Sequence, residues 1–422
     1  MVDLKNVELF KHLKNSFIIS QSDITKIFSN TILFLVFPKL LKLEVYAHYE
    51  IILNLSYIAY IISDFGTLKW THINSAKYSN NIGDSDNRFF FNIITHSSPF
   101  IFLGSLFFIF LLIISEIVLS KFLLIGCIFW VICYTLFNIL KSYNLGLKQF
   151  KLYSKIQYIE SFLIFILLIP IFLNPNSIEL LVFFNILYNI IIFTITMKLS
   201  NMKFLLIIPI FNKGLNFKFN ANYYRSLFQF FLINFSNILM TSFPIIWVDF
   251  YYSSEITAYT ALAIRVYQLI SIPLSPIGQV LTTHFASSNR DKWYLLLKNN
   301  IYLTILPLFV GFSTSLIVII IFDDLIIFIY GINFVYSYYI LRWLIISLLL
   351  KSITTFVVPF MLSIDDHNFI SICSTLSTIL MLLMYIFVDY SDLSFNITAP
   401  IIFSHIFFTL MLIFRIITKP KL

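Results

Sequence analysis

Twelve long apolar stretches, separated by short polar gaps, make up most of this chain. A helix needs about 20 mostly apolar residues to cross the roughly 30 Å hydrocarbon core of a bilayer. The stretches meet that length, so the sequence predicts twelve membrane-spanning helices. Composition agrees, because 59% hydrophobic residues and a mean hydropathy of +0.90 leave too little polar surface for a soluble globule. The expected spans are 16–38, 45–66, 89–115, 121–140, 151–173, 178–197, 226–250, 256–281, 297–322, 337–361, 368–388 and 396–416.

The basic residues fall almost entirely in alternate gaps between these spans. Twenty of the 28 Lys and Arg residues lie in the two tails and the even-numbered gaps, and three lie in the odd-numbered gaps. Loops rich in Lys and Arg remain on the cytoplasmic side of a membrane. We therefore expect cytoplasmic N- and C-termini, with Lys141, Lys148 and Lys151 in one cytoplasmic loop. The net charge of +8 reports topology, and nucleic acid is not an expected partner.

The gaps leave no room for a large domain outside the membrane, since every outward gap has about fifteen residues or fewer. The one sizeable inward gap, 198–225, is half apolar and suits an interfacial helix. The predicted fold class is all-α, a polytopic membrane protein of two six-helix bundles. The expected organisation is an N-terminal half (1–205), a cytoplasmic interfacial linker (206–225) and a C-terminal half (226–422).

A short motif suggests that the two halves are repeats. The pattern G-x4-T-H begins at Gly66 and again at Gly278, a displacement of 212 residues, which is half of the chain. Six spans separate the two copies, so both lie on the same side of the membrane. Such a repeat is parallel, with its axis along the membrane normal.

Two stretches, together with the twelve-span topology, resemble a known family. Residues 38–66 begin with a proline, continue through Glu44 and Tyr46 at the start of the next helix, and end in Asp-Phe-Gly. Residues 258–291 are similar to the family's eighth helix and the loop after it. The resemblance is to the multidrug, oligosaccharidyl-lipid and polysaccharide exporter superfamily and, within it, to the Wzx-type O-antigen flippases. This chain has Ala47, and Lys42 or Leu43, where that family usually has glycines.

The resemblance implies a function, a location and partners. The function is translocation of an undecaprenyl-pyrophosphate-linked oligosaccharide repeat unit across the bacterial inner membrane, for O-antigen or other surface polysaccharide. The implied partners are that glycan, the lipid bilayer, and the polymerase and chain-length regulator of the same pathway. No cofactor and no catalytic residue are expected. Two alternatives stay open: a cation-coupled exporter of small drugs, which favours acidic cavity residues, and an integral-membrane O-antigen polymerase, which carries a large outward loop that this chain lacks.

Acidic residues inside the spans are candidates for ion coupling, because charges there are costly and normally face a cavity or a partner. Asp23, Lys26 and Asn30 share one helical face at i, i+3 and i+7, which indicates a cavity or an ion pair near the boundary. Glu50 is either a coupling site or an interfacial carboxylate. Glu160 lies deep in its span and is either a proton or sodium site or a permanent partner of Lys155 or Arg265.

Basic residues inside the spans are candidates for contact with an anionic head group. Arg265 is about nine residues into an apolar span, and its planar fork suits a pyrophosphate. Gln268, one turn further on, adds a donor, and Lys351 and Lys26 are further candidates. The alternative for Arg265 is a structural salt bridge to Glu50, Glu160 or Asp249. The head group is expected in a cationic cavity between the two halves, near Lys26, Arg265 and Lys351.

Prolines inside the spans are candidate hinges, since each removes one backbone hydrogen bond. Pro273 and Pro276 follow Arg265 closely, so they would let the cytoplasmic end of that helix bend during alternating access. No cluster of Cys or His residues has metal-ligand spacing, so no metal site is expected. Asp323-Asp324 and Asp365-Asp366 are expected in loops, as solvated turn residues.

Overall fold

The computed structural model describes the chain in segments, and every regular element within them is a helix. The described residues are 21–22, 24–26, 28–30, 32–33, 36–78, 88–117, 119–147, 149–201, 221–271, 273–274, 277–278, 281, 301–363, 366–387 and 392–418. The chain divides into two compact units, Met1–Phe231 and Leu232–Leu422, with the boundary inside helix α9. Each unit is described by itself.

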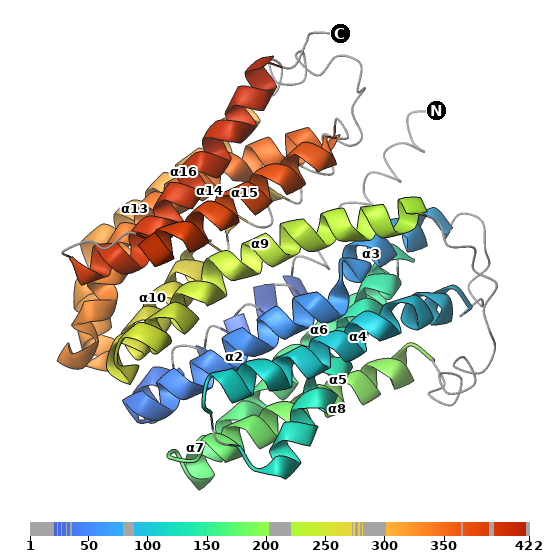
Figure 1. The fold of residues 1–422 in the computed structure, drawn as a ribbon, viewed down its shortest axis with the longest axis horizontal. Coiled ribbons are helices and arrows are strands. Elements are labelled where there is room, and N and C mark those ends of the chain that lie inside the picture. Colours follow the sequence, from blue (N-terminus) through green and yellow to red (C-terminus); the bar gives the residue numbers. More distant parts are fainter. Residues whose placement is uncertain are drawn as a thin grey trace. The chain divides into compact units, whose positions relative to one another are not determined.

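Unit 1 is a bundle of long helices (Figure 1). In it α2 packs against α4, and α5 packs against α3, α4 and α8. Its elements are α2 (Leu43–Asp64), α3 (Thr67–Tyr78), α4 (Arg88–Ile114), α5 (Lys121–Gly146), α6 (Phe150–Leu163), the 3₁₀ turn η1 (Ile164–Leu168), α7 (Ile169–Leu173), α8 (Ile178–Leu199) and the first part of α9 (Ala221–Tyr251).

Unit 2 is built around α14, which packs against α10, α13 and α16, while α15 packs against α16. Its core contains Phe356, Phe360, Cys373 and Leu412, all buried. After the second part of α9, its elements are α10 (Ser254–Ser271), α13 (Ile301–Tyr330), the 3₁₀ turn η5 (Ile332–Phe334), α14 (Val335–Ser363), α15 (His367–Phe387) and α16 (Leu393–Thr418).

Nine helices in the described part of the chain are long and apolar enough to cross a membrane. Helix α13 adds a tenth if its two arms, Pro307–Ile321 and Asp324–Tyr330, form one span despite a bend of 64° between them. The chain is thus a multi-pass membrane protein. The number twelve and the cytoplasmic position of the termini stay predictions, because most of 1–35 and 282–300 lies outside the described residues.

Three expectations about the ends of helices were wrong. Helix α5 continues to Gly146, so Lys141 lies inside a helix and not in a loop. The expected gap after the second span contains a further helix, α3. Asp324 lies in α13, which continues to Tyr330, and not in a loop. In α5 the apolar run ends before the helix does, because the helix continues through polar residues. Helix α3 is a separate polar helix after a left-handed turn, and in α13 a second apolar run, 325–330, follows Asp324.

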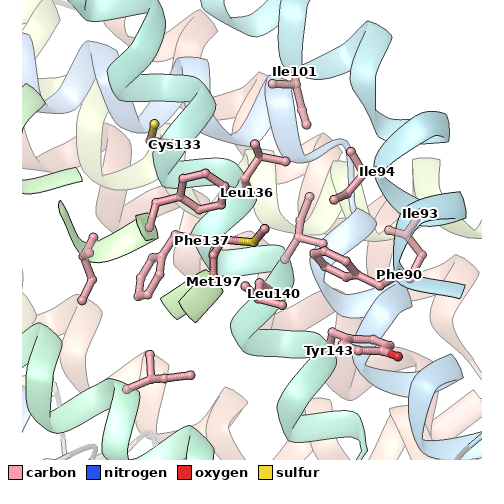
Figure 2. Close-up of a cluster of buried hydrophobic side chains, with 14 residues drawn as sticks. Phe90, Ile93, Ile94, Ile101, Cys133, Leu136, Phe137, Leu140, Tyr143 and Met197 are labelled. Atoms are coloured by element: carbon pink, nitrogen blue, oxygen red, sulfur yellow. The ribbon is translucent and has the colours of Figure 1, made fainter. Parts of the chain in front are cut away.

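Apolar side chains of α4 and α5 interlock in the core of unit 1 (Figure 2). Phe137 and Leu140 of α5, and Phe90 of α4, are at most 1% exposed, and Met197 of α8 joins them. The adjacent α5 residue, Lys141, lies at the border of this core. The alkyl part of the Lys141 side chain is therefore removed from water beside the apolar residues of the same helix.

The Asp-Phe-Gly segment joins α2 to α3 through a left-handed turn. Phe65 has φ 43° and Gly66 has φ 78°, and the Asp64 carboxylate accepts hydrogen bonds from the backbone N–H of Gly66 (3.2 Å) and Leu68 (2.7 Å). Asp64 thus satisfies backbone donors at the start of α3. The Phe65 ring stacks on Phe100, with ring centroids 4.1 Å apart. These contacts explain why the three residues occur together.

A break in the helical hydrogen bonding lies between α6 and α7. Pro170 cannot donate to the carbonyl one turn before it, and the residues ahead of it tighten into the 3₁₀ turn η1. Two residues of this region, Ile164 and Leu167, line the cavity of unit 1. The proline therefore shapes one wall of that cavity.

Helix α16 starts at an acidic cap. The Asp392 carboxylate accepts hydrogen bonds from the Ser394 hydroxyl (2.7 Å) and from the backbone N–H of Ser394 (2.9 Å). These hydrogen bonds hold the pKa of Asp392 below its ordinary value, because they stabilise the charged form, and the bond from the Ser394 hydroxyl contributes most. An anionic cap also suits the positive end of the helix dipole.

Candidate functional site

Two lysines form ion pairs with one buried glutamate in unit 1. The Lys26 ammonium lies 2.6 Å from one Glu160 carboxylate oxygen, and the Lys141 ammonium lies 3.0 Å from the other. Glu160 is 3% exposed and Lys141 is 8% exposed. Among the described residues of this cluster, two ammonium groups against one carboxylate leave an excess of positive charge.

Three segments bring this cluster together. Lys26 comes from the N-terminal helical residues, Lys141 from the last part of α5 and Glu160 from α6. Two aromatic rings, Phe137 and Tyr153, also face the Lys141 ammonium, with centroids 5.5 and 5.6 Å away. Such ring faces stabilise a desolvated cation. The second ammonium is therefore held by a carboxylate and by aromatic rings.

The partners of Glu160 differ from those expected. Lys155 is exposed, and Arg265 belongs to unit 2. Lys141, which the sequence interpretation placed in a loop, takes the place of Lys155. A proton or a sodium ion at Glu160 competes with two ammonium groups that stabilise the charged carboxylate, and ion coupling there stays a prediction. Asp23 lies outside the described residues.

A cavity of about 120 Å³ adjoins this cluster in unit 1, and its walls combine rings and amides. Helix α8 contributes Asn185, Tyr188 and Asn189, which share one helical face at i, i+3 and i+4. The other aromatic and amide side chains of the lining are Asn30, Phe37, Tyr49, Tyr57, Trp130 and Tyr134. Lys26 and Glu160 stand at its wall.

Unit 2 contains a larger cavity of about 380 Å³, and Lys351 of α14 lines it. The Lys351 ammonium donates to the Ser271 hydroxyl at 3.0 Å and lies 5.7 Å from the centroid of the Tyr267 ring. His405, on the same lining, has Nδ1 2.9 Å from the Ile401 carbonyl oxygen. The described residues that line this cavity include no carboxylate. Lys351 is therefore placed to attract an anion.

Arg265 is 4% exposed on α10, and its guanidinium donates to the Gln268 side-chain oxygen at 3.0 Å. Ile264 and Tyr267, the neighbours of these two residues, line the cavity of unit 2, while Arg265 and Gln268 are not among the lining residues. The structure thus brings the predicted pair together, and neither residue is among the described residues that line this cavity. Contact of either with a head group stays a prediction.

The other candidates lie elsewhere. Glu50 is fully buried in α2 and is not among the residues that line the unit 1 cavity. Helix α10 ends at Ser271 and Pro273 lies in a turn, where the proline interrupts the helix, while Pro276 lies outside the described residues. Gly66 has a positive φ and Gly278 does not, so the two copies of the G-x4-T-H motif begin with different backbone conformations.

Sequence reasoning missed Lys141 and the polar face of α8. The signal for the α8 face was present, since Asn185 and Asn189 are the i, i+4 amides of an otherwise apolar span. Lys141 had only a weak signal, because it follows the apolar run directly and resembles a boundary residue. In the described segments no group of three His, Cys, Asp or Glu residues has a geometry suited to a metal ion.

Comparison with known proteins places the fold. No protein-family model and no curated protein sequence matches the chain. Solved structures do match over nearly the whole length. The lipid II flippase MurJ, in an inward closed conformation, aligns with 96% of this chain and 88% of its own, at 16% identity and a TM-score of 0.67.

Two MATE transporters match similarly. An inward-facing MATE transporter of the MOP superfamily aligns with 96% of this chain and 100% of its own, at 12% identity and a TM-score of 0.64. The eukaryotic MATE transporter AtDTX14 aligns with 98% and 97%, at 11% identity and a TM-score of 0.65. This chain shares its fold with these three transporters. The same fold occurs in a lipid flippase and in MATE transporters, so the cargo has to be argued from the cavities.

Proposed function

We propose that this protein is a flippase that moves an undecaprenyl-pyrophosphate-linked oligosaccharide repeat unit across the bacterial inner membrane, for O-antigen or a related surface polysaccharide. Support comes from the fold, which MurJ shares, and from the sequence resemblance to Wzx-type flippases. The single observation that carries the proposal is Lys351, a half-buried cation on the lining of a cavity whose described lining residues include no carboxylate.

The charge at the cavity of unit 2 favours an anionic group of the cargo, and neither cavity favours a cation. A pyrophosphate loses its hydration when it leaves water, and that loss is offset only by donors and positive charge in the protein. Lys351 supplies both in unit 2, with neighbouring hydroxyl groups such as Ser271 and Thr354. In unit 1 the ammonium groups of Lys26 and Lys141 outnumber the one carboxylate of Glu160. A cationic drug would meet repulsion at both places.

The proposed mechanism is alternating access, in which the head group is shielded inside the helix bundles while the lipid tail remains in the bilayer. Lysine fits this task because its ammonium is a mobile point charge on a flexible stem, and releases an anion more readily than a rigid bidentate clamp does. Direction then follows from consumption of the glycan on the outer side. Arg265 and Gln268, which are not among the described lining residues, stabilise the segment of α10 that carries Tyr267.

Neutralising Lys351 is expected to abolish transport. In a host strain that lacks the gene, Lys351→Gln at normal protein level should lower the amount of O-antigen at least about tenfold, since a charge-assisted contact contributes about 1.5–3 kcal/mol. Lys351→Arg, which keeps the charge, should restore part of it. The matched control is Lys155→Gln, since Lys155 is an exposed lysine in the same protein. Full activity of Lys351→Gln would contradict the proposal.

The deletion strain itself separates the alternatives when its lipopolysaccharide is run on a gel. Core without any repeat unit indicates a failure of translocation and supports the flippase. Core with a single repeat unit indicates that polymerisation has failed, which supports the polymerase. An unchanged ladder together with increased sensitivity to cationic drugs supports the drug exporter.

A further inference from the structure

We infer that the cavity of unit 1 is a binding subsite for a neutral sugar ring. The inference deepens the proposed function, on which it rests for the presence of a glycan in the cargo. It is carried by the chemistry of the cavity wall, in which aromatic rings line the same space as two asparagines whose amide oxygens have no hydrogen-bond partner among the described residues.

The rings come from three helices. Trp130 and Tyr134 are one turn apart on α5, Tyr188 lies on α8 and Tyr57 lies on α2. A sugar ring has an apolar face of C–H groups, which packs on an aromatic face, and a periphery of hydroxyl groups. Tyr and Trp suit such a ligand because each combines an apolar body with a polar tip.

The amide of Asn189 has a defined and incomplete set of hydrogen bonds. Its Nδ2 donates to the Asn185 backbone carbonyl at 2.8 Å, and its Oδ1 is buried without a hydrogen-bond partner in the described protein. The orientation is fixed, because turning the amide over would place two acceptors against each other. Asn189, a 3% exposed residue, thus keeps an acceptor that no described residue satisfies, and a bound ligand could supply the donor.

A second amide repeats this feature. Asn30 Oδ1 is also buried without a hydrogen-bond partner among the described residues, and Asn30 lines the same cavity. Two unsatisfied acceptors call for two donors. The hydroxyl groups of a sugar provide several donors, whereas a pyrophosphate diester or a carboxylate provides none at neutral pH.

Size and charge agree with a neutral ring. A cavity of about 120 Å³ is several times the ~10–15 Å³ that one water requires by the same measure. Lys26, the cation at the wall, is already paired with Glu160 at 2.6 Å. The local excess of positive charge disfavours an organic cation, and the pairing of Lys26 leaves little demand for an anion. A hydroxylated neutral ligand fits both conditions.

The test measures binding of free sugars to the full-length protein in lipid nanodiscs. The probes are the methyl glycosides of glucose, galactose, mannose, rhamnose, N-acetylglucosamine and N-acetylgalactosamine, followed by saturation-transfer NMR. At least one glycoside should bind the wild type, and Asn189→Leu should weaken its binding at least tenfold. Tyr57→Leu, which removes a ring and leaves both amides intact, should weaken the same glycoside.

The matched control is Asn138→Leu. Asn138 of α5 also donates to the carbonyl four residues before it, at 2.8 Å, but is not among the residues that line the cavity. Its loss should leave binding unchanged. The inference is overturned if no glycoside binds the wild type, or if Asn189→Leu binds as well as Asn138→Leu does.

Two further experiments complete the test. The first compares a free sugar with a lipid-linked sugar, and the second distinguishes failure of this inference from failure of the proposed function. The lipid-linked probe is prenyl-pyrophosphate-linked N-acetylglucosamine, and Asn189→Leu should bind it more weakly than the wild type does. If only this probe binds, and Asn189→Leu binds it as well as the wild type does, the site recognises lipid or phosphate and the inference is overturned. Lys351→Gln should retain binding of the free glycoside. Loss of sugar binding with intact O-antigen transport rejects this inference alone, and intact sugar binding without any transport defect in Lys351→Gln rejects the proposed function alone.

Discussion

Gly66→Ala is expected to lower the thermal stability of the protein sharply. Gly66 has φ 78°, and a Cβ atom at this position would overlap the backbone oxygen of Leu227 and lie 3.0 Å from the backbone nitrogen of Phe231. Backbone atoms of a helix cannot move aside as a flexible side chain does. The strained φ alone costs about 1–3 kcal/mol, and the overlap adds a similar amount. The melting temperature of the purified protein in detergent measures the effect.

Gly331→Ala provides a matched control for this prediction. Gly331 has a similar φ of 83°, but a Cβ added there would meet no atom within 4 Å. The control isolates the backbone strain from the close approach of α9. Gly331→Ala should therefore cost about 1 kcal/mol. Equal losses of melting temperature in the two variants would show that the contact with Leu227 contributes nothing.

Glu160→Ala is expected to destabilise unit 1 by about 3 kcal/mol or more, because removal of one partner leaves uncompensated buried charge. Both ammonium groups that contact the carboxylate lose their counter-ion, and Lys141 has little access to water. The expected loss of stability is at the low end of the range for a broken buried ion pair, since the Lys26 side chain is 26% exposed and regains some hydration. Chemical unfolding followed by accessibility of the buried Cys127 and Cys133 reports on this unit.

A combined variant separates charge from packing at this cluster. Glu160→Leu with Lys26→Met and Lys141→Met keeps the volume and removes all three charges, so its stability should return close to that of the wild type. Glu255→Gln, at an exposed carboxylate in the first turn of α10, should have little effect. A combined variant as unstable as Glu160→Ala would show that the ion pairs are not the reason for the loss.

The spans themselves were accessible from the sequence, because the requirement for a long apolar run is local and strong. The predicted span 178–197 corresponds to α8 (Ile178–Leu199), and the predicted span 368–388 corresponds to α15 (His367–Phe387). Ends were harder. Helix α3 and the last turns of α5 are polar, and they are helical because partners in other helices satisfy their side chains, which no local window reveals.

The candidate residues could be recognised one by one, but their pairing could not. Glu160, Lys26 and Lys351 were singled out because a charge inside an apolar run is costly wherever the run packs. Which cation meets which carboxylate depends on how separate helices pack, so the sequence offered Lys155 for Glu160 where the structure has Lys141. Arg265 also looked like the leading ligand, and its absence from the described lining of the cavity depends on the rotation of α10 about its axis.

The sequence by itself determined that this is a multi-pass helical membrane protein with charged residues in its interior, since hydropathy and charge are properties of single segments. Tertiary structure alone decided that Lys141 completes the cluster around Glu160, that Lys351 and not Arg265 lines the cavity of unit 2, and that rings and amides of three helices share one cavity in unit 1. The physical reason is that a site is made of directions and distances between helices. Those are set by the packing of many side chains at once, and by no single segment.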